Sequence, residues 1–260
     1  MDRMPSLFVS HGAPTFAIEP GEAGPMLMQL GRELRRPTAV LVMSPHWITR
    51  GLAVATTAQP ETIHDFGGFP EELYRIRYPA PGSPQVAQRA LELLGAAGLQ
   101  ASGDADMGLD HGAWVPVRHL YPDADVPVLQ VSMPHRLDPA TAVRIGRALA
   151  PLAGEGVLII GSGSITHNLR EVFSSPGSEK GVAYANEFVA WARHAVQTHD
   201  EAALVNYVDD APHALHAHPT PDHYLPLPFA FGAADPQASV RVIDGGMTFG
   251  VLAMDAYVFG

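Results

Sequence analysis

Short apolar runs alternate with longer amphipathic stretches along most of the chain. Four of these runs are rich in β-branched residues and close at Gly, Pro or Ser, and they span residues 7–12, 39–47, 126–133 and 156–164. Short apolar runs that end in such turn residues predict buried strands. We therefore expect four strands at these positions.

The stretches between the runs repeat apolar residues at spacings of three and four, which predicts amphipathic helices. They cover residues 24–35, 84–97, 138–152 and 179–198. The third begins with Asp138 and Pro139, which are favoured at an N-cap and at the first helical position. Near the C-terminus, two apolar runs flank Asp244-Gly245-Gly246. This arrangement predicts a hairpin or a tight return.

Strands that alternate with helices predict crossover connections and a largely parallel sheet. The C-terminal return adds antiparallel pairing. We therefore expect an α/β fold with a mixed, mostly parallel central sheet flanked by helices on both faces. No linker, repeat or low-complexity stretch interrupts the pattern, so residues 1–260 are expected to form a single domain.

Composition and charge narrow the classes of function. Hydrophobic residues make up 47% of the chain, yet no apolar run approaches the length of a membrane helix. The formal charge is −11 and no basic stripe is present, which argues against a nucleic-acid partner. The apolar start is too short for a signal peptide. These features predict a soluble acidic protein of the cytoplasm that binds neither membrane nor nucleic acid.

Cysteine is absent, which excludes disulfides, thiolate metal ligands and cysteine nucleophiles. Histidine, in contrast, occurs 13 times. Two predicted strands run directly into a histidine, His11 and His46, and a third delivers His167 through a stretch of Gly and Ser. His111 and the run from His216 to His223 fall in predicted loops.

Ligands of open α/β sheets bind outside the carboxyl ends of the strands. Imidazole suits zinc, copper, iron and nickel. Structural zinc sites are mostly thiolate-rich, so histidines gathered at this sheet edge favour a catalytic metal. Two other interpretations fit poorly. The Gly161-Ser162-Gly163-Ser164 stretch lacks the spacing of a hydrolase nucleophile elbow, and it does not complete a dinucleotide-binding loop.

Five motifs, taken together and in order, resemble the DODA-type extradiol ring-opening dioxygenases, a LigB-like, class III family. This family shares a superfamily with the catalytic subunit of protocatechuate 4,5-dioxygenase. The resemblance runs from about residue 5 to the C-terminus. The motifs are His11-Gly12-Ala13-Pro14, Ser44-Pro45-His46-Trp47, Asp110-His111-Gly112-Ala113-Trp114, Gly161-Ser162-Gly163-Ser164-Ile165-Thr166-His167-Asn168 and His218-Pro219-Thr220-Pro221-Asp222-His223.

The resemblance implies a non-haem Fe(II) enzyme that opens a catechol ring, such as that of a DOPA-like substrate, with O₂. It implies that His11 and His46 are the first two metal ligands and that His223 is the third. His218 and Asp222 are the competing candidates for the third position, and Asp222 is disfavoured because neighbours in an extended segment point to opposite sides. A three-histidine site also suits Zn(II), which is expected to occupy it in purified protein.

The chemistry also needs a base that accepts a catechol proton and returns it, and His167 matches the family's acid–base residue. The Gly/Ser turn before it is expected to leave space for substrate. The resemblance implies that His111 is the second catalytic residue, near the bound oxygens, where it contacts either the substrate or a metal ligand. Three further residues are assigned to substrate contact: His218, Asp110 and Ser164. Three are expected to orient ligand imidazoles: Ser10, Ser44 and Asp110.

Two alternative functions stay open at this stage. A zinc-dependent hydrolase on the same scaffold would use similar ligands and a carboxylate base, for which Glu19 and Asp110 are the candidates. A non-enzymatic, Memo-like binding protein would have no need for His167 at the end of a Gly/Ser turn. The expected partners are a small catechol and O₂, and a homodimer is the expected assembly for an acidic α/β enzyme of this size.

Overall fold

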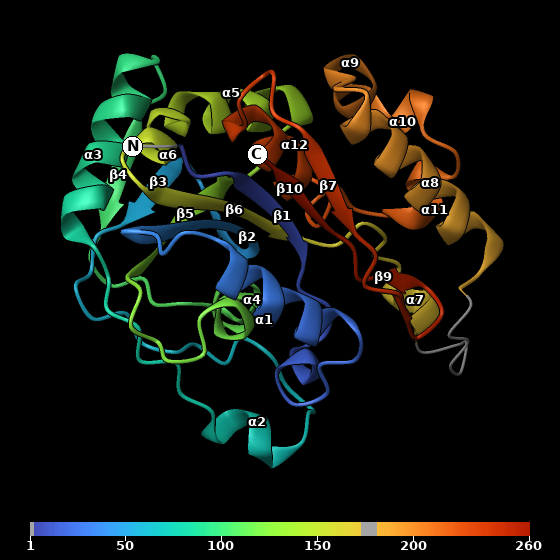
Figure 1. The fold of residues 1–260 in the computed structure, drawn as a ribbon, viewed down its shortest axis with the longest axis horizontal. Coiled ribbons are helices and arrows are strands. Elements are labelled where there is room, and N and C mark those ends of the chain that lie inside the picture. The colour runs from blue at the N-terminus through green and yellow to red at the C-terminus, as the bar shows by residue number, and fades with distance from the viewer. Residues whose placement is uncertain (1–2, 173–180) are drawn as a thin grey trace.

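Eight strands form one mixed sheet in the computed structural model, which describes residues 3–172 and 181–260 (Figure 1). Their order across the sheet is β4-β3-β5-β2-β6-β1-β10-β7. The four strands at the centre, β5, β2, β6 and β1, are parallel neighbours, whereas β3, β10 and β7 add antiparallel pairs. The strands are β1 (Ser6–Ser10), β2 (Ala39–Thr49), β3 (Leu52–Ala55), β4 (Ala101–Asp104), β5 (Val128–Pro134), β6 (Val157–Gly163), β7 (Val240–Ile243) and β10 (Ala256–Phe259). The predicted α/β class and mixed sheet are confirmed.

Helices cover both faces of this sheet (Figure 1). The helices predicted from periodicity are confirmed as α1, α3, α5 with α6, and α8, although residues 179–180 of the last prediction lie outside the described residues. Asp138 caps α5 by accepting a hydrogen bond from the Thr141 amide. The helices are η1 (Pro14–Ala17), α1 (Ala23–Glu33), α2 (Glu71–Arg75), α3 (Pro84–Ala96), α4 (His111–Leu120), α5 (Pro139–Leu149), α6 (Pro151–Gly154), α7 (Leu169–Val172), α8 (Ala183–Gln197), α9 (Glu201–Val205), α10 (Tyr207–Asp210), α11 (Ala214–Ala217) and α12 (Pro226–Ala233).

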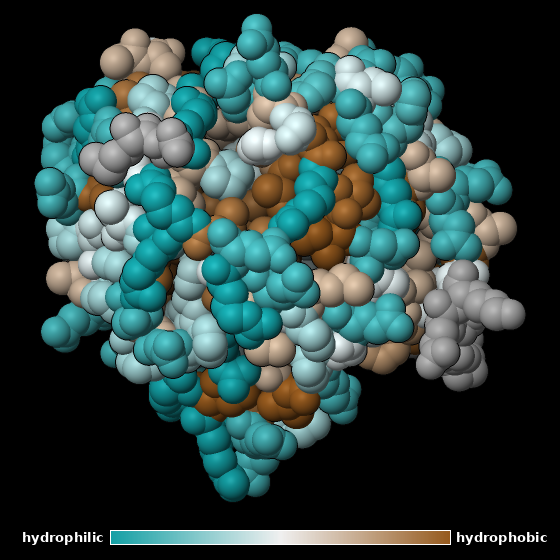
Figure 2. Space-filling model, in the orientation of Figure 1, coloured by the Kyte–Doolittle hydropathy of each residue, from teal (hydrophilic) through white to brown (hydrophobic). Residues whose placement is uncertain are grey.

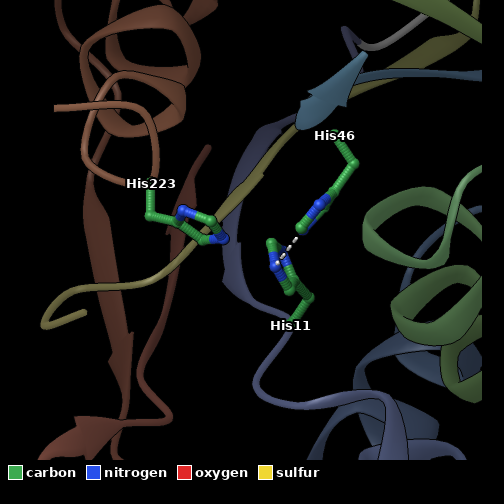
Figure 3. Close-up of side chains that lie close together, drawn as sticks. All are labelled: His11, His46 and His223. Carbon is green, nitrogen blue, oxygen red and sulfur yellow. Dashed lines mark hydrogen bonds between the residues drawn. The ribbon is translucent and has the colours of Figure 1, made fainter. Parts of the chain in front are cut away.

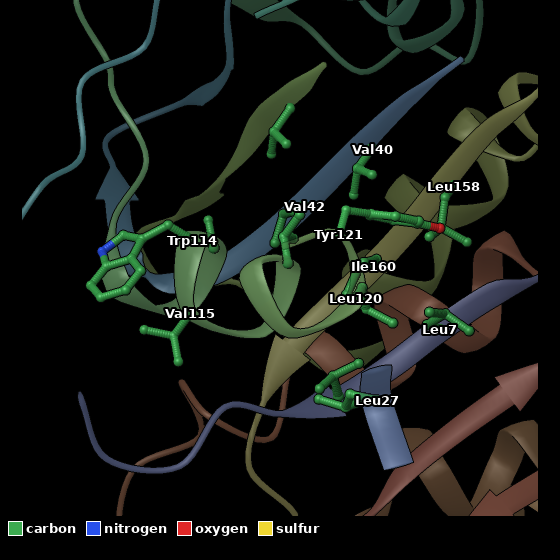
Figure 4. Packing of buried hydrophobic residues seen from close by; sticks show 14 of the residues in the cluster. Leu7, Leu27, Val40, Val42, Trp114, Val115, Leu120, Tyr121, Leu158 and Ile160 are labelled. Atoms are coloured by element: carbon green, nitrogen blue, oxygen red, sulfur yellow. The ribbon is translucent and has the colours of Figure 1, made fainter. Parts of the chain in front are cut away.

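The central strands are buried on both faces, which explains their continuous apolar sequences. Side chains alternate between the faces of a strand, so neighbours along β2 enter different clusters. Val40 and Val42 pack with Leu27 of α1 in the cluster drawn in Figure 4. Leu41 packs on the opposite face with Phe229 of α12. The sheet is therefore the rigid middle layer that carries the strand ends described below.

Helix α4 was not predicted, because its motif was assigned to a loop. It runs from His111 to Leu120, and every residue in it except Arg118 is buried. Gly112 and Pro116 conceal it, since both residue types disfavour helix interiors. The loop prediction for this segment is wrong for these reasons.

The C-terminal return is longer than predicted. β7 pairs antiparallel with β10, as a hairpin requires. Residues 244–255 lie between them and form a second ribbon, β8 (Met247–Thr248) with β9 (Leu252–Ala253). Gly245 lies so close to Met254 that a Cβ would stand 2.1 Å from its carbonyl oxygen. The glycines therefore allow the chain to fold back against itself rather than to make a two-residue turn.

The surface is mainly hydrophilic on the face that Figure 2 shows. The apolar groups of this face gather at the centre, over β10 and β7. Among the described helices, none combines the length and the apolarity that crossing a membrane requires. The buried apolar residues lie mainly in the clusters that line the two faces of the sheet.

Candidate metal centre

Three histidines converge at the carboxyl ends of the central strands (Figure 3). His11 follows β1, His46 lies near the end of β2, and His223 lies just before α12. The Nε2 atoms of His11 and His46 are 3.2 Å apart. One ring nitrogen of each of the three residues lies within 4.8 Å of the others. The His223 ring centre is 5.2 Å from each of the other two, so the three imidazoles surround a common point.

An irregularity in β2 presents His46. The pairing of β2 with β5 shifts register between Met43 and Ile48. Pro45 lies in this interval and has no N–H to give to a ladder. Such bulges redirect side chains beside active sites. The sequence prediction that a strand leads into His46 is confirmed, and the bulge explains how the strand continues to Thr49 beyond it.

A hydrogen-bond chain fixes the ring of His11. The Ser162 hydroxyl donates to the Gly112 carbonyl, so its oxygen accepts from His11 Nδ1 at 3.0 Å. The Gly112 carbonyl would normally bond to the amide of residue 116, but Pro116 has none. The proline inside α4 thus leaves this carbonyl to Ser162. Because Nδ1 carries the proton, Nε2 of His11 presents a free lone pair.

His223 is oriented by the residue before it. Asp222 Oδ2 accepts a hydrogen bond from His223 Nδ1 at 2.6 Å, which leaves Nε2 with a free lone pair. Sequence reasoning disfavoured Asp222 as a ligand on the premise of an extended segment, in which neighbours point apart. That premise is wrong, because residues 221–224 form a turn. The turn brings the two side chains together as an imidazole and its hydrogen-bond acceptor.

Glycines of β6 admit the backbone that carries His223. A Cβ at Gly163 would lie 2.3 Å from the His223 carbonyl oxygen, and one at Gly161 would lie 2.0 Å from that of Pro226. The Ser164 amide donates to the His223 carbonyl at 2.9 Å. The prediction that small residues permit a close approach is confirmed. The space beside the two glycines holds the chain itself rather than the substrate that was expected there.

Sequence reasoning missed Asp65, which contacts two histidines at once. Its Oδ2 lies 2.8 Å from His111 Nδ1 and 3.4 Å from His46 Nδ1, while its Oδ1 accepts from the His111 amide at 2.9 Å. The rings of His46 and His111 have centres 3.9 Å apart. Asp65 lies in a loop without a strand-end context. Its only signal was its place next to His64, a histidine that the motifs left unassigned.

The buried imidazoles are held neutral. Burial, followed by the nearby imidazoles, keeps the pKa of His11 well below its ordinary value and lowers that of His46 to about 2. Burial also lowers the pKa of His223, although Asp222 opposes the effect. Burial would raise the pKa of Asp65, but the hydrogen bonds from His111 outweigh it and the pKa falls. Neutral rings keep the lone pairs that a cation needs.

His167 and His218 flank the cluster in different ways. The His167 ring stacks on His223, with centres 3.5 Å apart and planes 6° from parallel. Burial, and then the nearby His223, lowers its pKa to about 2. His218 donates from Nε2 to the Ile165 carbonyl at 2.8 Å, and its buried Nδ1 has no hydrogen-bond partner among the described residues. His223 rather than His218 completes the cluster of three nitrogens.

All three residues assigned to substrate contact, His218, Asp110 and Ser164, are deeply buried. Asp110 caps α4, where its Oδ1 accepts from the Ala113 amide and from the Ser44 hydroxyl. Burial raises the pKa of Asp110 to about 6. The Ser164 hydroxyl donates to the Thr166 carbonyl at 2.8 Å. Substrate contact by either side chain stays a prediction.

The imidazoles are oriented by other residues than those expected. Ser10, Ser44 and Asp110 are the residues expected from the sequence to orient the ligand rings. Among the described contacts, none of these three side chains bonds to a ligand ring. The partners that the structure provides are Ser162, Asp65 and Asp222. The expected partners adjoin the motif histidines in sequence, whereas Ser162 and Asp65 reach them through the fold.

This donor set fits a divalent transition metal. The Nδ1 atoms of His11 and His223 are committed to acceptors, so their Nε2 lone pairs point into the cluster. The Nε2 atoms of His11 and His46 are 3.2 Å apart, and they repel each other unless a cation or a proton lies between them. Three imidazoles with no carboxylate among them suit iron and zinc alike.

The chain is similar to known proteins over nearly its whole length. A family model described as the catalytic LigB subunit of aromatic ring-opening dioxygenase matches residues 6–260. The chain is 40% identical over 255 residues to the 4,5-DOPA dioxygenase extradiol of Escherichia coli (strain K12), which covers 97% of this chain and 93% of that protein. It is 39% identical over 259 residues to the protein of the same name from Beta vulgaris, with 98% and 96% covered.

A solved structure shows the same architecture. The crystal structure of an uncharacterized protein from Escherichia coli K12 aligns with a TM-score of 0.81 and 34% identity, and it covers 99% of this chain and 100% of that one. The family match and the relatives extend over nearly the whole sequence, including every segment that carries a histidine of the cluster. The chain therefore belongs to the LigB family of class III extradiol dioxygenases, enzymes that open aromatic rings.

Proposed function

We propose that the chain opens the ring of a DOPA-like catechol with O₂ and that it uses Fe(II). The observation that carries the proposal is the convergence of His11, His46 and His223, whose ring nitrogens lie within 4.8 Å of one another. The names of the relatives, 4,5-DOPA dioxygenase extradiol, support the substrate class. When bound by these three imidazoles, Fe(II) supplies the Lewis acidity that lowers the pKa of catechol hydroxyls and the redox chemistry that O₂ requires.

His167 is the proposed acid–base residue. Its imidazole stacks on His223 at the border of the cluster, and its backbone amide is fixed by the Ala217 carbonyl at 2.8 Å. A neutral imidazole in this place can accept a proton from a catechol hydroxyl and return it as the ring opens. The support for this role is the position of the ring beside the proposed ligands.

His111 is the proposed contact of the substrate oxygens. Its Nδ1 donates to Asp65, which leaves Nε2 as the free acceptor of the ring. Among the other residues assigned to substrate contact, His218 keeps an unpartnered Nδ1. Asp110 and Ser164 are already hydrogen-bonded within the chain. We therefore place His111 and then His218 before these two as contacts.

The test begins with metal-free protein, because a three-histidine site also takes Zn(II). The full chain is reconstituted anaerobically with Fe(II), DOPA is added, and air is admitted while absorbance and O₂ uptake are recorded. We expect a yellow product in step with O₂ uptake. His167→Ala should retain iron and lose turnover by about 10²–10⁴-fold, the usual contribution of an acid–base group.

His194→Ala is the matched control, since His194 is exposed on α8 and belongs to none of the contacts above. It should keep both iron and turnover. No product across a panel of catechols, with iron bound, would overturn the proposed substrate class. Full turnover in His167→Ala would overturn the role of that residue alone.

A further inference from the structure

One carboxylate touches two histidines to which different tasks are assigned. Asp65 Oδ2 faces Nδ1 of His46, a proposed metal ligand, and Nδ1 of His111, the proposed substrate contact. The second oxygen, Oδ1, accepts from the His111 amide at 2.9 Å. Because both oxygens are engaged, the carboxylate cannot rotate toward one ring without loosening its hold on the other.

We propose that Asp65 is a positioning residue that couples the metal ligand His46 to the substrate contact His111. The proposal rests on the proposed function only for the tasks of these two histidines. It states that metal affinity and catechol affinity both depend on this one side chain, and that its influence on catechol affinity passes through His111.

The hydrogen bond to Asp65 sets which nitrogen of His111 is free, and the same carboxylate oxygen faces Nδ1 of His46. An imidazole that donates from Nδ1 to a carboxylate keeps its lone pair on Nε2. His111 makes this bond at 2.8 Å, and His46 Nδ1 lies 3.4 Å from the same oxygen. The two rings also touch, with centres 3.9 Å apart. A displacement of either ring therefore displaces the other, both by direct contact and through Asp65.

The loop around Asp65 is anchored to the body of the protein. The Ile63 carbonyl accepts from Trp114 Nε1 of α4 at 3.1 Å, and His64 Nε2 donates to the Ile76 carbonyl at 3.1 Å. The side chain of Asp65 is 21% exposed. A carboxylate held on this anchored stretch presents a fixed charge to both rings, as the outer partners of metal-binding histidines commonly do.

Asp222 provides the natural comparison. It also accepts a hydrogen bond from a proposed ligand, His223, but it bonds to no second histidine of the site among the described hydrogen bonds. Both carboxylates should therefore support metal binding. Only Asp65 should affect the catechol through His111, and this difference separates coupling from general support of the metal.

The experiment uses the full chain and two readouts that need no turnover. The Zn(II) affinity of metal-free protein is measured by chelator competition, and the catechol affinity of zinc-saturated protein by calorimetry. The variants are Asp65→Asn, Asp222→Asn, His111→Ala and both double variants with His111→Ala, and Asp106→Asn in an exposed loop is the neutral control. Asp65→Asn should lower Zn(II) affinity by about 10–100-fold and should also lower catechol affinity.

The double variants decide the mechanism. In the His111→Ala background, Asp65→Asn should still lower Zn(II) affinity but should no longer change catechol affinity. Asp222→Asn should have the same effects with and without His111, because it acts at a separate contact. An unchanged Zn(II) affinity in Asp65→Asn, or an undiminished catechol effect without His111, would overturn the coupling.

Loss of folding is distinguished by Asp65→Glu, which keeps the charge. If Asp65→Asn is unstable in thermal melting, the glutamate variant carries the same test, and its longer side chain should weaken both affinities. The zinc measurement is independent of the proposed reaction. If the wild-type chain opens no catechol, the proposed function is refuted and the Zn(II) measurement still tests the role of Asp65. If the enzyme is active but its Zn(II) affinity does not depend on Asp65, only the coupling is refuted.

Discussion

The histidines of the candidate metal centre come from two kinds of backbone. His11 directly follows β1 and His46 lies in β2, and both strands lie in the interior of the sheet and are buried on both faces. His223 lies in a turn that packs against the end of β6. His11 and His46, the strand-borne pair, are held in place by the hydrogen-bonded neighbouring strands and by the hydrophobic clusters on the two faces of the sheet. The turn-borne ring depends on a few local contacts.

This difference indicates which substitutions can displace a metal ligand. Moving His11 or His46 requires the sheet to move, and buried sheet interiors are closely packed and resist deformation. His223 is held by the bond from the Ser164 amide to its carbonyl and by Asp222. Changes on the strand side should therefore act through the ligand itself, whereas changes on the turn side should act through the backbone.

The largest effect is expected from removing a strand-borne ligand. His46→Ala should lose bound metal together with turnover. Only two imidazole ligands remain, and the rigid sheet cannot move another side chain into the place of the third. The fold should persist, since His46 is partly exposed and belongs to neither of the core clusters to which β2 contributes. Metal analysis of the purified variant checks this, and a metal content equal to wild type would show that the ligand assignment is wrong.

A smaller effect is expected from displacing the turn. In Gly163→Ala the new Cβ would lie 2.3 Å from the His223 carbonyl oxygen, so the turn must move away from β6. Overpacking of this kind costs about 1–3 kcal/mol, which corresponds to a loss of roughly 5–150-fold in metal affinity if the whole cost falls on the metal-bound state. Chelator titration measures it.

Gly95→Ala in α3 is the matched control for this substitution. Nothing lies within 4 Å of a Cβ at Gly95, and alanine favours a helix over glycine. It should raise the melting temperature slightly and leave metal affinity unchanged. An equal metal affinity in Gly163→Ala and wild type would show that the turn is not held against β6 in the way described.

The same contrast explains what could be predicted from the sequence. The strand-borne histidines follow β-branched runs, and the rule that sites lie beyond strand ends applies to them directly. The placement of His223 came from the family resemblance, because nothing in its local sequence gives the path of the turn. The contact depends on Gly163, and a glycine in the sequence does not say which backbone will approach it.

Other features were hidden for physical reasons that can be named. Helix α4 contains Gly112 and Pro116, two residue types that argue against a helix in a sequence prediction. Strands β3 and β4 are short, and β4 reads Ala-Ser-Gly-Asp, a composition typical of loops. Asp65 reaches its histidines from a loop 46 residues away from His111. Contacts of this range are set by the tertiary fold and leave no local pattern.

The smallest expected effect sharpens the strand side of the comparison. Ser162→Ala removes the oxygen that accepts from His11 Nδ1, and a buried donor left without a partner costs about 1–3 kcal/mol. Because β1 keeps the ring in place, part of this cost should fall on stability and the loss of Zn(II) affinity should be about tenfold or less. Ser6→Ala is the control, since its hydroxyl also donates to a buried carbonyl, at Ala230, but at the opposite end of β1. Ser6→Ala should lower the melting temperature without changing Zn(II) affinity. A loss in Ser162→Ala as large as that in Gly163→Ala would mean that the strand-borne ring is no better held than the turn-borne one.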